Sequence, residues 1–376
     1  MSNFNHLKTG LSAPICLTWE LTYACNLSCA HCLSSSGRRD PHELSTDEAK
    51  EVIDQLVEMN VFYINIGGGE PTIRSDFKTI ASYALSKGVG VKFSTNGSRI
   101  DRDMAQWISE ESYLDVQVSL DGATASTNDE IRGPGSFQTA ITALEVLQSA
   151  KAPSVKVSTV ITNKSISQLD ELYALSASYG AQLRVTRLRP SGRGALTWAS
   201  LKLSQVEQEY LFRWLSCHRD VLTGDSFFHL SPLGDPLDGL NMCGAGRVVC
   251  LIDPVGDVYA CPFVIHDSFR AGNLRDTSFM EIWRHSKVFE CLRNETGPKS
   301  CSTCNAIDSC HGGCMATKFF NGLSFDDPDP ECVFGRGAMT LSRVKTSIMP
   351  DLSRSRPIYI RPNKSAKNST VASRKI

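Results

Sequence analysis

Three cysteines lie close together near the start of the chain, at Cys25, Cys29 and Cys32. Their spacing, C-x3-C-x2-C, can supply three thiolates to a [4Fe–4S] cube and leaves the fourth iron without a protein ligand. An open iron can accept a small molecule, as a catalytic cluster must, whereas electron-transfer clusters usually have four protein ligands. The alternative is a zinc knuckle with His31 as fourth ligand, although ligands this close in sequence fit a tetrahedron poorly. We therefore expect catalytic, iron-binding cysteines here.

A larger group of cysteines lies in the C-terminal half of the chain. It comprises Cys243, Cys250, Cys261, Cys301, Cys304, Cys310, Cys314 and Cys332. Clustered cysteines in a chain of this size with no export signal are typical of metal or cluster ligands rather than disulfides. Two structural zinc sites are the alternative, because C-x2-C pairs also occur in zinc ribbons. Three further cysteines are expected to be small buried residues: Cys16, Cys217 and Cys291.

The composition is that of a folded protein without a membrane span. The chain has 376 residues, of which 41% are hydrophobic and 21% charged, and no apolar run reaches the roughly 18 residues that a transmembrane helix needs. The N-terminus lacks the apolar core of a signal peptide, so we expect a cytoplasmic location. Residues 338–376 carry nine Lys or Arg and one Asp, and the rest of the chain has a net charge of −9. Such an acidic body gives no reason to expect nucleic-acid binding.

These cysteines must be positioned by an alternation of strands and helices. Strand-like runs lie at 15–21, 61–66, 89–94, 114–120, 155–161 and 182–188. Helical patterns lie between them: the first starts at Ser45, and the others lie at 75–88, 101–111, 136–150, 165–179 and 203–217. Ser45 and Glu48 form a capping box at the start of the first helix. This order predicts an α/β fold with a parallel sheet, either doubly wound or a partial barrel, with its chemistry at the C-terminal ends of the strands.

After the sixth strand and its helix the alternation stops, and Gly, Pro and Cys become frequent. One helix is expected near 278–292. Too little periodic apolar sequence remains for an ordinary hydrophobic core, so inorganic clusters would supply the missing stability. We expect an N-terminal segment at 1–14, a barrel-like region at 15–225, a cysteine-rich domain at 226–336 and a basic, disordered tail at 337–376.

The first cysteine motif, placed directly after the first strand, resembles the signature of the radical S-adenosylmethionine enzymes. The resemblance implies a partial (β/α)6 barrel whose open iron chelates S-adenosylmethionine. Reduction of that cofactor yields a 5′-deoxyadenosyl radical, which abstracts a hydrogen atom from the substrate. The protein's part is to hold the cofactor and keep the radical away from solvent.

Further motifs at successive strand ends fit this resemblance. The residues that it implies in cofactor binding are Gly68, Gly69, Glu70, Ser94, Asn96, Ser119, Asp121 and Arg132. The glycines would let the backbone approach the methionyl amino group, with Glu70 as an acceptor. Arg132 matches an arginine that holds the cofactor carboxylate in related enzymes. Each motif alone is an ordinary turn signal, but the ordered set is much more specific.

The C-terminal cysteines match the seven-cysteine motif of the SPASM extension of these enzymes, with Cys250 as an eighth thiolate. Eight thiolates can ligate two auxiliary [4Fe–4S] clusters, which makes three clusters in all. The resemblance implies that the first auxiliary cluster takes Cys243, Cys250, Cys261 and Cys314. The second would take Cys301, Cys304, Cys310 and Cys332. This crossed order would tie both ends of the cysteine-rich segment together.

Segments outside the cluster motifs resemble one family of these enzymes, the mycofactocin radical S-adenosylmethionine maturases, up to about residue 336. They lie at 32–40, 61–71, 187–194, 222–229 and 241–250. The resemblance implies a precursor peptide ending in Val-Tyr as the substrate. A hydrogen atom is abstracted from the terminal tyrosine, carbon dioxide leaves, and one electron passes to an auxiliary cluster. A second turnover joins the valine and former tyrosine carbons in a lactam.

The resemblance also implies partners and leaves alternatives. An external electron donor is needed, and a small chaperone protein that carries the precursor is expected, because only 24 residues precede Cys25. The alternatives are a pyrroloquinoline-quinone-type or thioether-forming peptide maturase and a sulfatase-maturing enzyme. A zinc-binding regulatory protein is the alternative outside enzymes.

Three arginines at or just past the sixth strand are candidates for holding the carboxylate of the substrate. They are Arg187, Arg189 and Arg193. A guanidinium grips a carboxylate through two hydrogen bonds, a task for which lysine is a poor substitute. Arg187 and Arg189 share one face if the strand extends that far. The alternative is that these arginines are solvated charges or hold the cofactor.

Overall fold

Nine strands form one sheet in the order β6-β5-β4-β3-β2-β1-β7-β8-β9. Their bounds are β1 Cys16–Thr22, β2 Tyr63–Gly68, β3 Gly90–Thr95, β4 Leu114–Ser119, β5 Val155–Ile161, β6 Gln182–Arg187, β7 Val249–Ile252, β8 Asp257–Tyr259 and β9 Arg270–Asn273. The first seven run parallel to their neighbours, and β8 and β9 are antiparallel. The computed structural model describes residues 10–342 except 225–226, 236, 238–241 and 296. The six predicted strands are confirmed to within two residues at each end.

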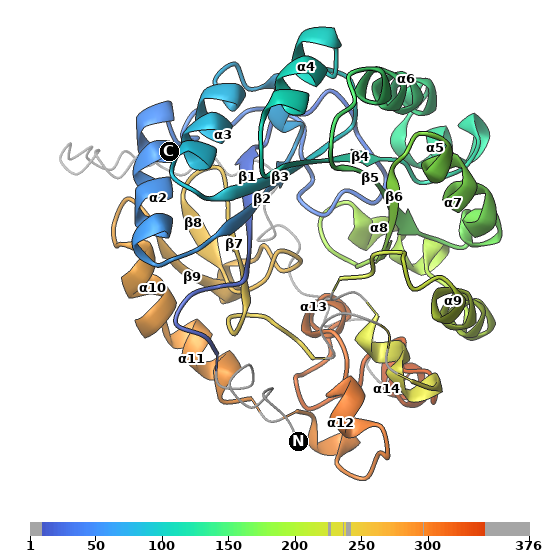
Figure 1. Cartoon of the computed structure of the whole chain (residues 1–376). Coiled ribbons are helices and arrows are strands. Elements are labelled where there is room, and N and C mark those ends of the chain that lie inside the picture. Colours follow the sequence, from blue (N-terminus) through green and yellow to red (C-terminus); the bar gives the residue numbers. More distant parts are fainter. Residues whose placement is uncertain (1–9, 225–226, 236, 238–241, 296, 343–376) are drawn as a thin grey trace, which may run out of the picture.

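Helices cover the outer face of the curved sheet (Figure 1). The sheet is not closed, because its edge strands β6 and β9 do not pair with each other. The helices of the barrel are α2 Thr46–Glu58, α3 Phe77–Ser86, α4 Arg102–Glu110, α5 Ala125–Arg132, α6 Ser136–Ser149, α7 Leu169–Ser178, α8 Gly194–Leu201 and α9 Gln205–Cys217. The predicted capping box of Ser45 and Glu48 begins α2. Two helices, α5 and α8, were not expected. Of the two folds that the sequence allowed, a doubly wound sheet and a partial barrel, the structure has the partial barrel.

The sheet has an apolar outer face and a polar inner face. Leu17, Trp19 and Leu21 of β1 alternate with polar residues and are buried in the main core together with residues of the helices. Because side chains alternate between the faces of a strand, the intervening positions share the inner face. These inner residues include Thr18, Glu20, Asn65, Lys92, Ser94, Asp115, Gln117, Ser119, Lys156, Ser158 and Thr186. A polar barrel interior suits polar ligands better than a filled hydrophobic core.

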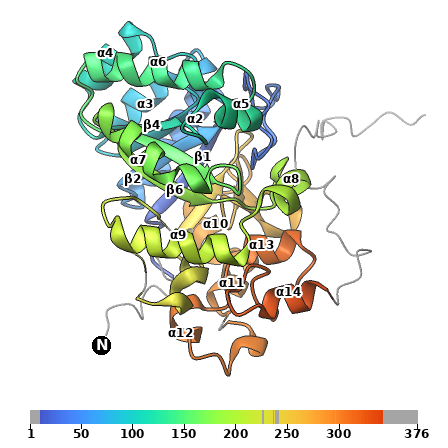
Figure 2. The ribbon, with the colours of Figure 1, turned by 90° about the vertical axis from the view of Figure 1, so that its right-hand side faces the viewer.

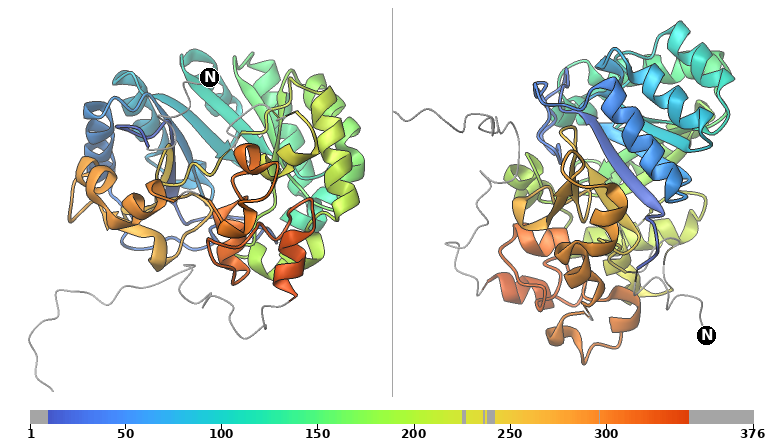
Figure 3. Two further views of the ribbon diagram at one scale, coloured as in Figure 1. Left: turned by 90° about the horizontal axis from the view of Figure 1, so that it is seen from below. Right: turned by 90° about the vertical axis from the view of Figure 1, so that its left-hand side faces the viewer.

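The C-terminal region extends the sheet of the barrel. β7 lies parallel to β1, with Cys16 opposite Val249 and Trp19 opposite Ile252. Five short helices follow, α10 Phe279–His285, α11 Lys287–Arg293, α12 Ile307–Cys310, α13 Met315–Phe320 and α14 Arg336–Leu341. Figure 2 shows these orange and red segments at the opposite end from α4 and α6, and both views of Figure 3 show them beside the barrel.

The expectation that this region lacks an ordinary core is wrong. Phe279, Trp283 and Phe289 are at most 1% exposed and belong to the same hydrophobic core as the barrel. Their helical spacing was visible, but the single helix expected there is broken at Ser286 into α10 and α11. Much of the region's stability therefore comes from apolar burial.

The C-terminal tail begins later than expected. The predicted boundary after residue 336 falls within α14, Arg336–Leu341. The remainder of the predicted basic tail, from 343 onwards, lies outside the described residues, as does most of the N-terminal segment. No helix in the described part of the chain is both long and apolar enough to cross a membrane.

Candidate active site

The cysteine loop that follows β1 folds back on the end of its own strand. The amide of Cys25 donates to the carbonyl of Gly37 at 2.9 Å, and that of Gly37 donates to Tyr23 at 2.8 Å. The thiols of Cys25, Cys29 and Cys32 are free and only partly buried. Three free thiols on one loop at the mouth of the barrel fit a [4Fe–4S] cube with one open iron.

His31 of the cysteine loop is held by a buried carboxylate. Its Nε2 lies 2.6 Å from the Oδ2 of Asp121, which follows β4 and is fully buried. Its Nδ1 is buried and has no partner among the described residues. The zinc knuckle with His31 as fourth ligand therefore stays an alternative.

Asp121 also pairs with Arg132, the last residue of α5, with 2.6 Å between Nε and Oδ2. Burial alone would raise the pKa of Asp121, but the charges of Arg132 and His31 hold this pKa well below its usual range. The carboxylate is thus ionised and enclosed. Asp121 fixes His31 of the cysteine loop against α5, and its contact with the cofactor stays a prediction.

Glu70 is likewise enclosed, with 1% of its surface exposed. Its carboxylate accepts hydrogen bonds from the hydroxyl of Thr95 at 2.8 Å and the amide of Asn96 at 2.6 Å, besides two from Thr72. Burial raises its pKa. A carboxyl group with this many donors joins the ends of β2 and β3, and its contact with the cofactor stays a prediction.

The two glycines before Glu70 bring the end of β2 against the cysteine loop. The amide of Gly69 donates to Thr22 at 2.7 Å, and that of Glu70 donates to Ala24 at 2.8 Å. A Cβ at Gly69 would lie 2.0 Å from the carbonyl oxygen of Ala24. Only glycine permits this approach.

The remaining predicted cofactor residues lie around the same mouth. Asn96 donates to Asn26 of the cysteine loop at 2.8 Å, and its amide nitrogen lies 4.0 Å from the sulfur of Cys25. Ser94 accepts from Gln117 at 3.0 Å. Ser119 ends β4 and is partly exposed. The structure thus places these three residues at neighbouring strand ends.

The three candidate arginines have three different environments. Arg187 is buried and paired with the carboxylates of Asp329 and Glu331. The cavity beside it has a volume of only about 10 Å³, room for a single water. Arg193 donates to the carbonyl of Cys29 at 2.9 Å and to that of Ser36 at 2.8 Å. The prediction that Arg187 binds the substrate carboxylate is therefore wrong, because its charge is already matched by two carboxylates. Arg193 holds the cysteine loop.

Arg189 is the exception. It is 5% exposed, its Nε and Nη1 have no hydrogen-bond partner in the described structure, and its guanidinium lies 3.6 Å from the ring centre of Phe263. The loop that follows β6 contacts the cysteine loop, because the amide of Arg193 donates to the carbonyl of Cys32. A buried cation with free donors is suited to an anionic ligand.

The auxiliary cysteines fall into two neighbourhoods. Cys243 interacts electrostatically with Cys314. Cys310 interacts with Cys301 and Cys332, and Cys301 with Cys304. Cys250 lies in β7 and Cys261 directly follows β8, so both belong to the hairpin of these strands. These neighbourhoods fit the crossed ligand sets that the resemblance implied.

Charges around the auxiliary cysteines are unequal. Burial raises the pKa of Cys310 to about 12, and raises that of Cys25 in the first loop to about 11. Burial acts in the same direction on Cys314, but the guanidinium groups of Arg189 and Arg187 bring its pKa below the ordinary value. This lowered pKa favours the thiolate of Cys314, the form that binds iron.

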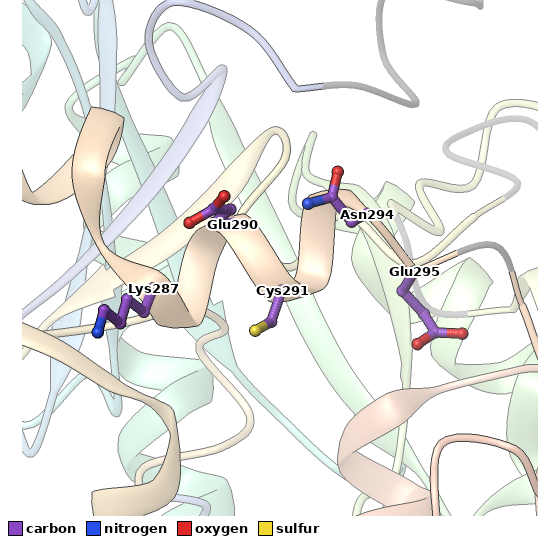
Figure 4. Close-up of a pocket in the computed structure, with 5 residues that line it drawn as sticks. All are labelled: Lys287, Glu290, Cys291, Asn294 and Glu295. Atoms are coloured by element: carbon purple, nitrogen blue, oxygen red, sulfur yellow. The ribbon is translucent and has the colours of Figure 1, made fainter.

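Two of the isolated cysteines are not buried as expected. Cys217 and Cys291 are both exposed, and the side chain of Cys16 is outside the described set. Cys291 lines a surface hollow of about 490 Å³ on α11, together with Lys287, Glu290, Asn294 and Glu295 (Figure 4). None of these residues belongs to the predicted site.

Comparison with known proteins agrees with this geometry. Residues 19–175 match the Radical SAM superfamily, and residues 243–305 match SPASM, an iron–sulfur cluster-binding domain. Fold, cysteine loop and auxiliary cysteines together define a radical S-adenosylmethionine enzyme that binds iron–sulfur clusters and S-adenosylmethionine.

The subfamily follows from whole-chain similarity. Mycofactocin maturase MftC of Mycolicibacterium smegmatis is 58% identical over 353 residues, which cover 93% of this chain and 90% of that protein. The Mycobacterium ulcerans protein of the same name is 56% identical over 95% of this chain and 97% of its own. The chain belongs to the family of mycofactocin maturases.

A solved structure supports the fold independently. Streptococcus suis SuiB, bound to its precursor peptide SuiA, superimposes with a TM-score of 0.72 at 18% identity, covering 86% of this chain and 77% of that one. At this identity the likeness establishes the shared fold, the partial barrel with its cysteine-rich extension.

Proposed function

We propose that the enzyme matures a mycofactocin precursor peptide ending in Val-Tyr. The observation that carries the proposal is the identity of 56–58% to mycofactocin maturases over nearly the whole chain, together with the three free thiols at the barrel mouth. The bound cofactor supplies a 5′-deoxyadenosyl radical that removes one hydrogen atom from the terminal tyrosine. The carboxylate then leaves as carbon dioxide together with one electron, which an auxiliary cluster would accept. A second turnover joins the valine and former tyrosine carbons in a lactam.

Three [4Fe–4S] clusters are proposed. Cys25, Cys29 and Cys32 hold the first. Cys243, Cys250, Cys261 and Cys314 hold one auxiliary cluster, and Cys301, Cys304, Cys310 and Cys332 hold the other. About twelve irons per chain are expected after anaerobic reconstitution. Changing the first three cysteines together to Ala should remove about four irons and abolish formation of 5′-deoxyadenosine; continued formation would refute this assignment.

The cofactor is proposed to bind at the mouth formed by β2, β3 and β4. Gly68 and Gly69 offer backbone groups, and Ser94, Asn96 and Ser119 offer polar side chains at neighbouring strand ends. Glu70, Asp121 and Arg132 hold this frame through the contacts described above. The proposed mouth is open to a ligand from the polar inner face of the barrel.

Arg189 is proposed to hold the carboxylate that the peptide loses. Its free donors and its burial support this role. Its charge interaction with Cys314 also supports it, because a carboxylate held by Arg189 would leave near a proposed auxiliary cluster. Arg189→Lys should weaken precursor binding by roughly 1–3 kcal/mol, with S-adenosylmethionine affinity unchanged. Equal precursor affinity in both proteins would remove Arg189 from this role.

The proposed partners are an external electron donor and a small chaperone that carries the precursor, and the proposed compartment is the cytoplasm. One experiment tests the reaction. The enzyme is incubated anaerobically with reductant, S-adenosylmethionine, precursor and chaperone, and the mass of the peptide is measured by mass spectrometry. Loss of carbon dioxide and two hydrogen atoms from the terminal residue is expected. A thioether, or a crosslink with the carboxylate retained, would favour the other maturase classes.

A further inference from the structure

The inner face of the barrel contains a gap at Gly67. Glu20 of β1 and Gly67 of β2 are register partners, so they share this face. A Cβ built on Gly67 would meet no heavy atom within 4 Å. The φ of Gly67 is outside the left-handed region, so its backbone conformation does not require glycine. What the missing side chain leaves is room next to Glu20.

Unpartnered hydrogen-bond acceptors border this gap. The Oε2 of Glu20 and the Oδ1 of Asn65, two residues before Gly67 on the same face, are buried and have no donor among the described residues. The Oε1 of Gln117, further across the inner face, is also buried without a donor, while the side-chain nitrogen of Gln117 donates to Ser94. A buried acceptor without a donor costs about 1–3 kcal/mol. Three such acceptors on one face offer hydrogen-bonding positions to a ligand, or to water while no ligand is bound.

The chemistry of the peptide terminus selects its phenol for this gap. A carboxylate has no hydrogen to donate to these acceptors, and a cation with free donors for it is already present at Arg189. A phenol hydroxyl is a donor, and its flat ring can lie against a glycine backbone where no side chain projects. We propose that the hydroxyl of the precursor's terminal tyrosine enters the gap at Gly67 and donates to Glu20, with Asn65 as the neighbouring acceptor.

This inference rests on the proposed function and adds a specificity to it. A site built to bind a hydroxyl rejects the analogue that lacks it, because its own buried acceptors stay unpaired. The enzyme should therefore prefer a precursor ending in Val-Tyr to one ending in Val-Phe. The preference should depend on the acceptors.

The test compares both precursors on wild type, Glu20→Met and Asn65→Leu, with the chaperone present. We expect the wild type to favour Tyr over Phe at least tenfold in kcat/KM and in precursor affinity. In Glu20→Met the preference should fall at least tenfold, and in Asn65→Leu it should fall less. Iron content and S-adenosylmethionine affinity should not change. Ser158→Ala, on the inner face of β5, is the matched control and should keep the wild-type preference.

A second variant fills the gap without removing an acceptor. Gly67→Val has space for its side chain and retains a strand-forming residue, so it should fold and bind iron as the wild type does. Its affinity for the Tyr precursor should fall at least tenfold. An undiminished affinity, or an unchanged Tyr preference in Glu20→Met, would overturn the inference; so would loss of S-adenosylmethionine affinity in Gly67→Val, which would assign the gap to the cofactor. If the wild type converts no Val-Tyr precursor at all, the proposed function itself fails.

Discussion

Arg187 and Asp329 form a two-fold hydrogen-bonded ion pair between the last residue of β6 and a loop 142 residues further along the chain. The same carboxylate accepts the amide of Cys314 at 2.7 Å. A residue of the barrel thus helps to fix the backbone of an auxiliary cysteine. Burial opposes the charge on both partners, but each keeps the other ionised: the pKa of Asp329 is well below and that of Arg187 well above the usual range.

Arg187→Met should therefore destabilise the enzyme strongly. The change leaves Asp329 and Glu331 buried without their cation, which costs about 3–5 kcal/mol. Thermal unfolding and iron analysis under anaerobic conditions should show a lower melting temperature and loss of auxiliary iron. Arg275→Met is the matched control, because Arg275 joins α2 to the C-terminal region through a half-exposed pair with Glu48; its loss should cost at most about 1 kcal/mol. Equal effects would show that burial of the Arg187 pair is unimportant.

Asp121→Asn should release the cysteine loop. The neutral amide cannot balance Arg132, and its contact with His31 weakens. We expect iron to fall by about four atoms per chain, the content of one cube. Asp115→Asn, in β4 just before Asp121 but paired with a less buried Lys156, should keep its iron. Full iron and normal S-adenosylmethionine affinity in Asp121→Asn would contradict the positioning role.

Glu20 should give stability a measurable pH dependence. Burial, with a smaller contribution from the charge of Asp253, raises its pKa from 4.5 to about 8. The folded chain therefore keeps a proton that the unfolded chain loses, so stability falls as pH rises from about 4.5 to 8 and then levels off. Glu20→Gln removes this loss and should be more stable than wild type at pH 8 by a few kcal/mol. The difference in melting temperature should shrink toward pH 6; a constant difference would disprove the assignment.

Gly69→Ala should separate β2 from the cysteine loop. Its Cβ would lie 2.0 Å from a backbone oxygen that cannot turn away, so we expect a loss of about 3 kcal/mol and a poorly loaded first cluster. Gly37→Ala is the control within the same loop, because a Cβ there meets nothing within 4 Å. Similar melting temperatures and iron contents for the two variants would count against this close approach.

Cys310→Ala should uncouple the reaction. Without the cluster of Cys310, 5′-deoxyadenosine should still form while decarboxylated peptide does not, since the electron could no longer be passed on from the cluster of Cys314. Chromatography of both products measures the ratio. Cys291→Ala removes an exposed cysteine outside the clusters and should leave the ratio unchanged. Normal peptide conversion in Cys310→Ala would make the auxiliary clusters structural only.

Local patterns predicted the strands because the apolar outer positions recur in each of them. They did not predict α5, whose sequence Ala-Ser-Thr-Asn-Asp-Glu-Ile-Arg is mostly polar. This helix is held by hydrogen bonds of Asn128 and Asp129 to the segments before and after it. The polar alternation in β1 was visible in Thr18, Glu20 and Thr22 but was not read as an inner face.

The candidate site was predictable where a motif is local and not where partners are distant. The first three cysteines and the glycine turn lie at the ends of β1 and β2, as their positions directly after two strand-like runs predicted. The role of Arg187 depends on Asp329 and Glu331, which are over 140 residues away, and no spacing rule connects them. The same holds for Asp121 and His31, 90 residues apart.

The register of β1 with β7 also bears on how the polypeptide can be divided. β1 has β2 on one side and β7 on the other. A fragment that ends before residue 243 would therefore expose the edge of β1, whose unpaired amides and carbonyls favour self-association. The fragment from 243 onwards would in turn lose half of its shared core. Neither piece is a natural unit for expression, and heating the intact enzyme should melt both together in one cooperative transition.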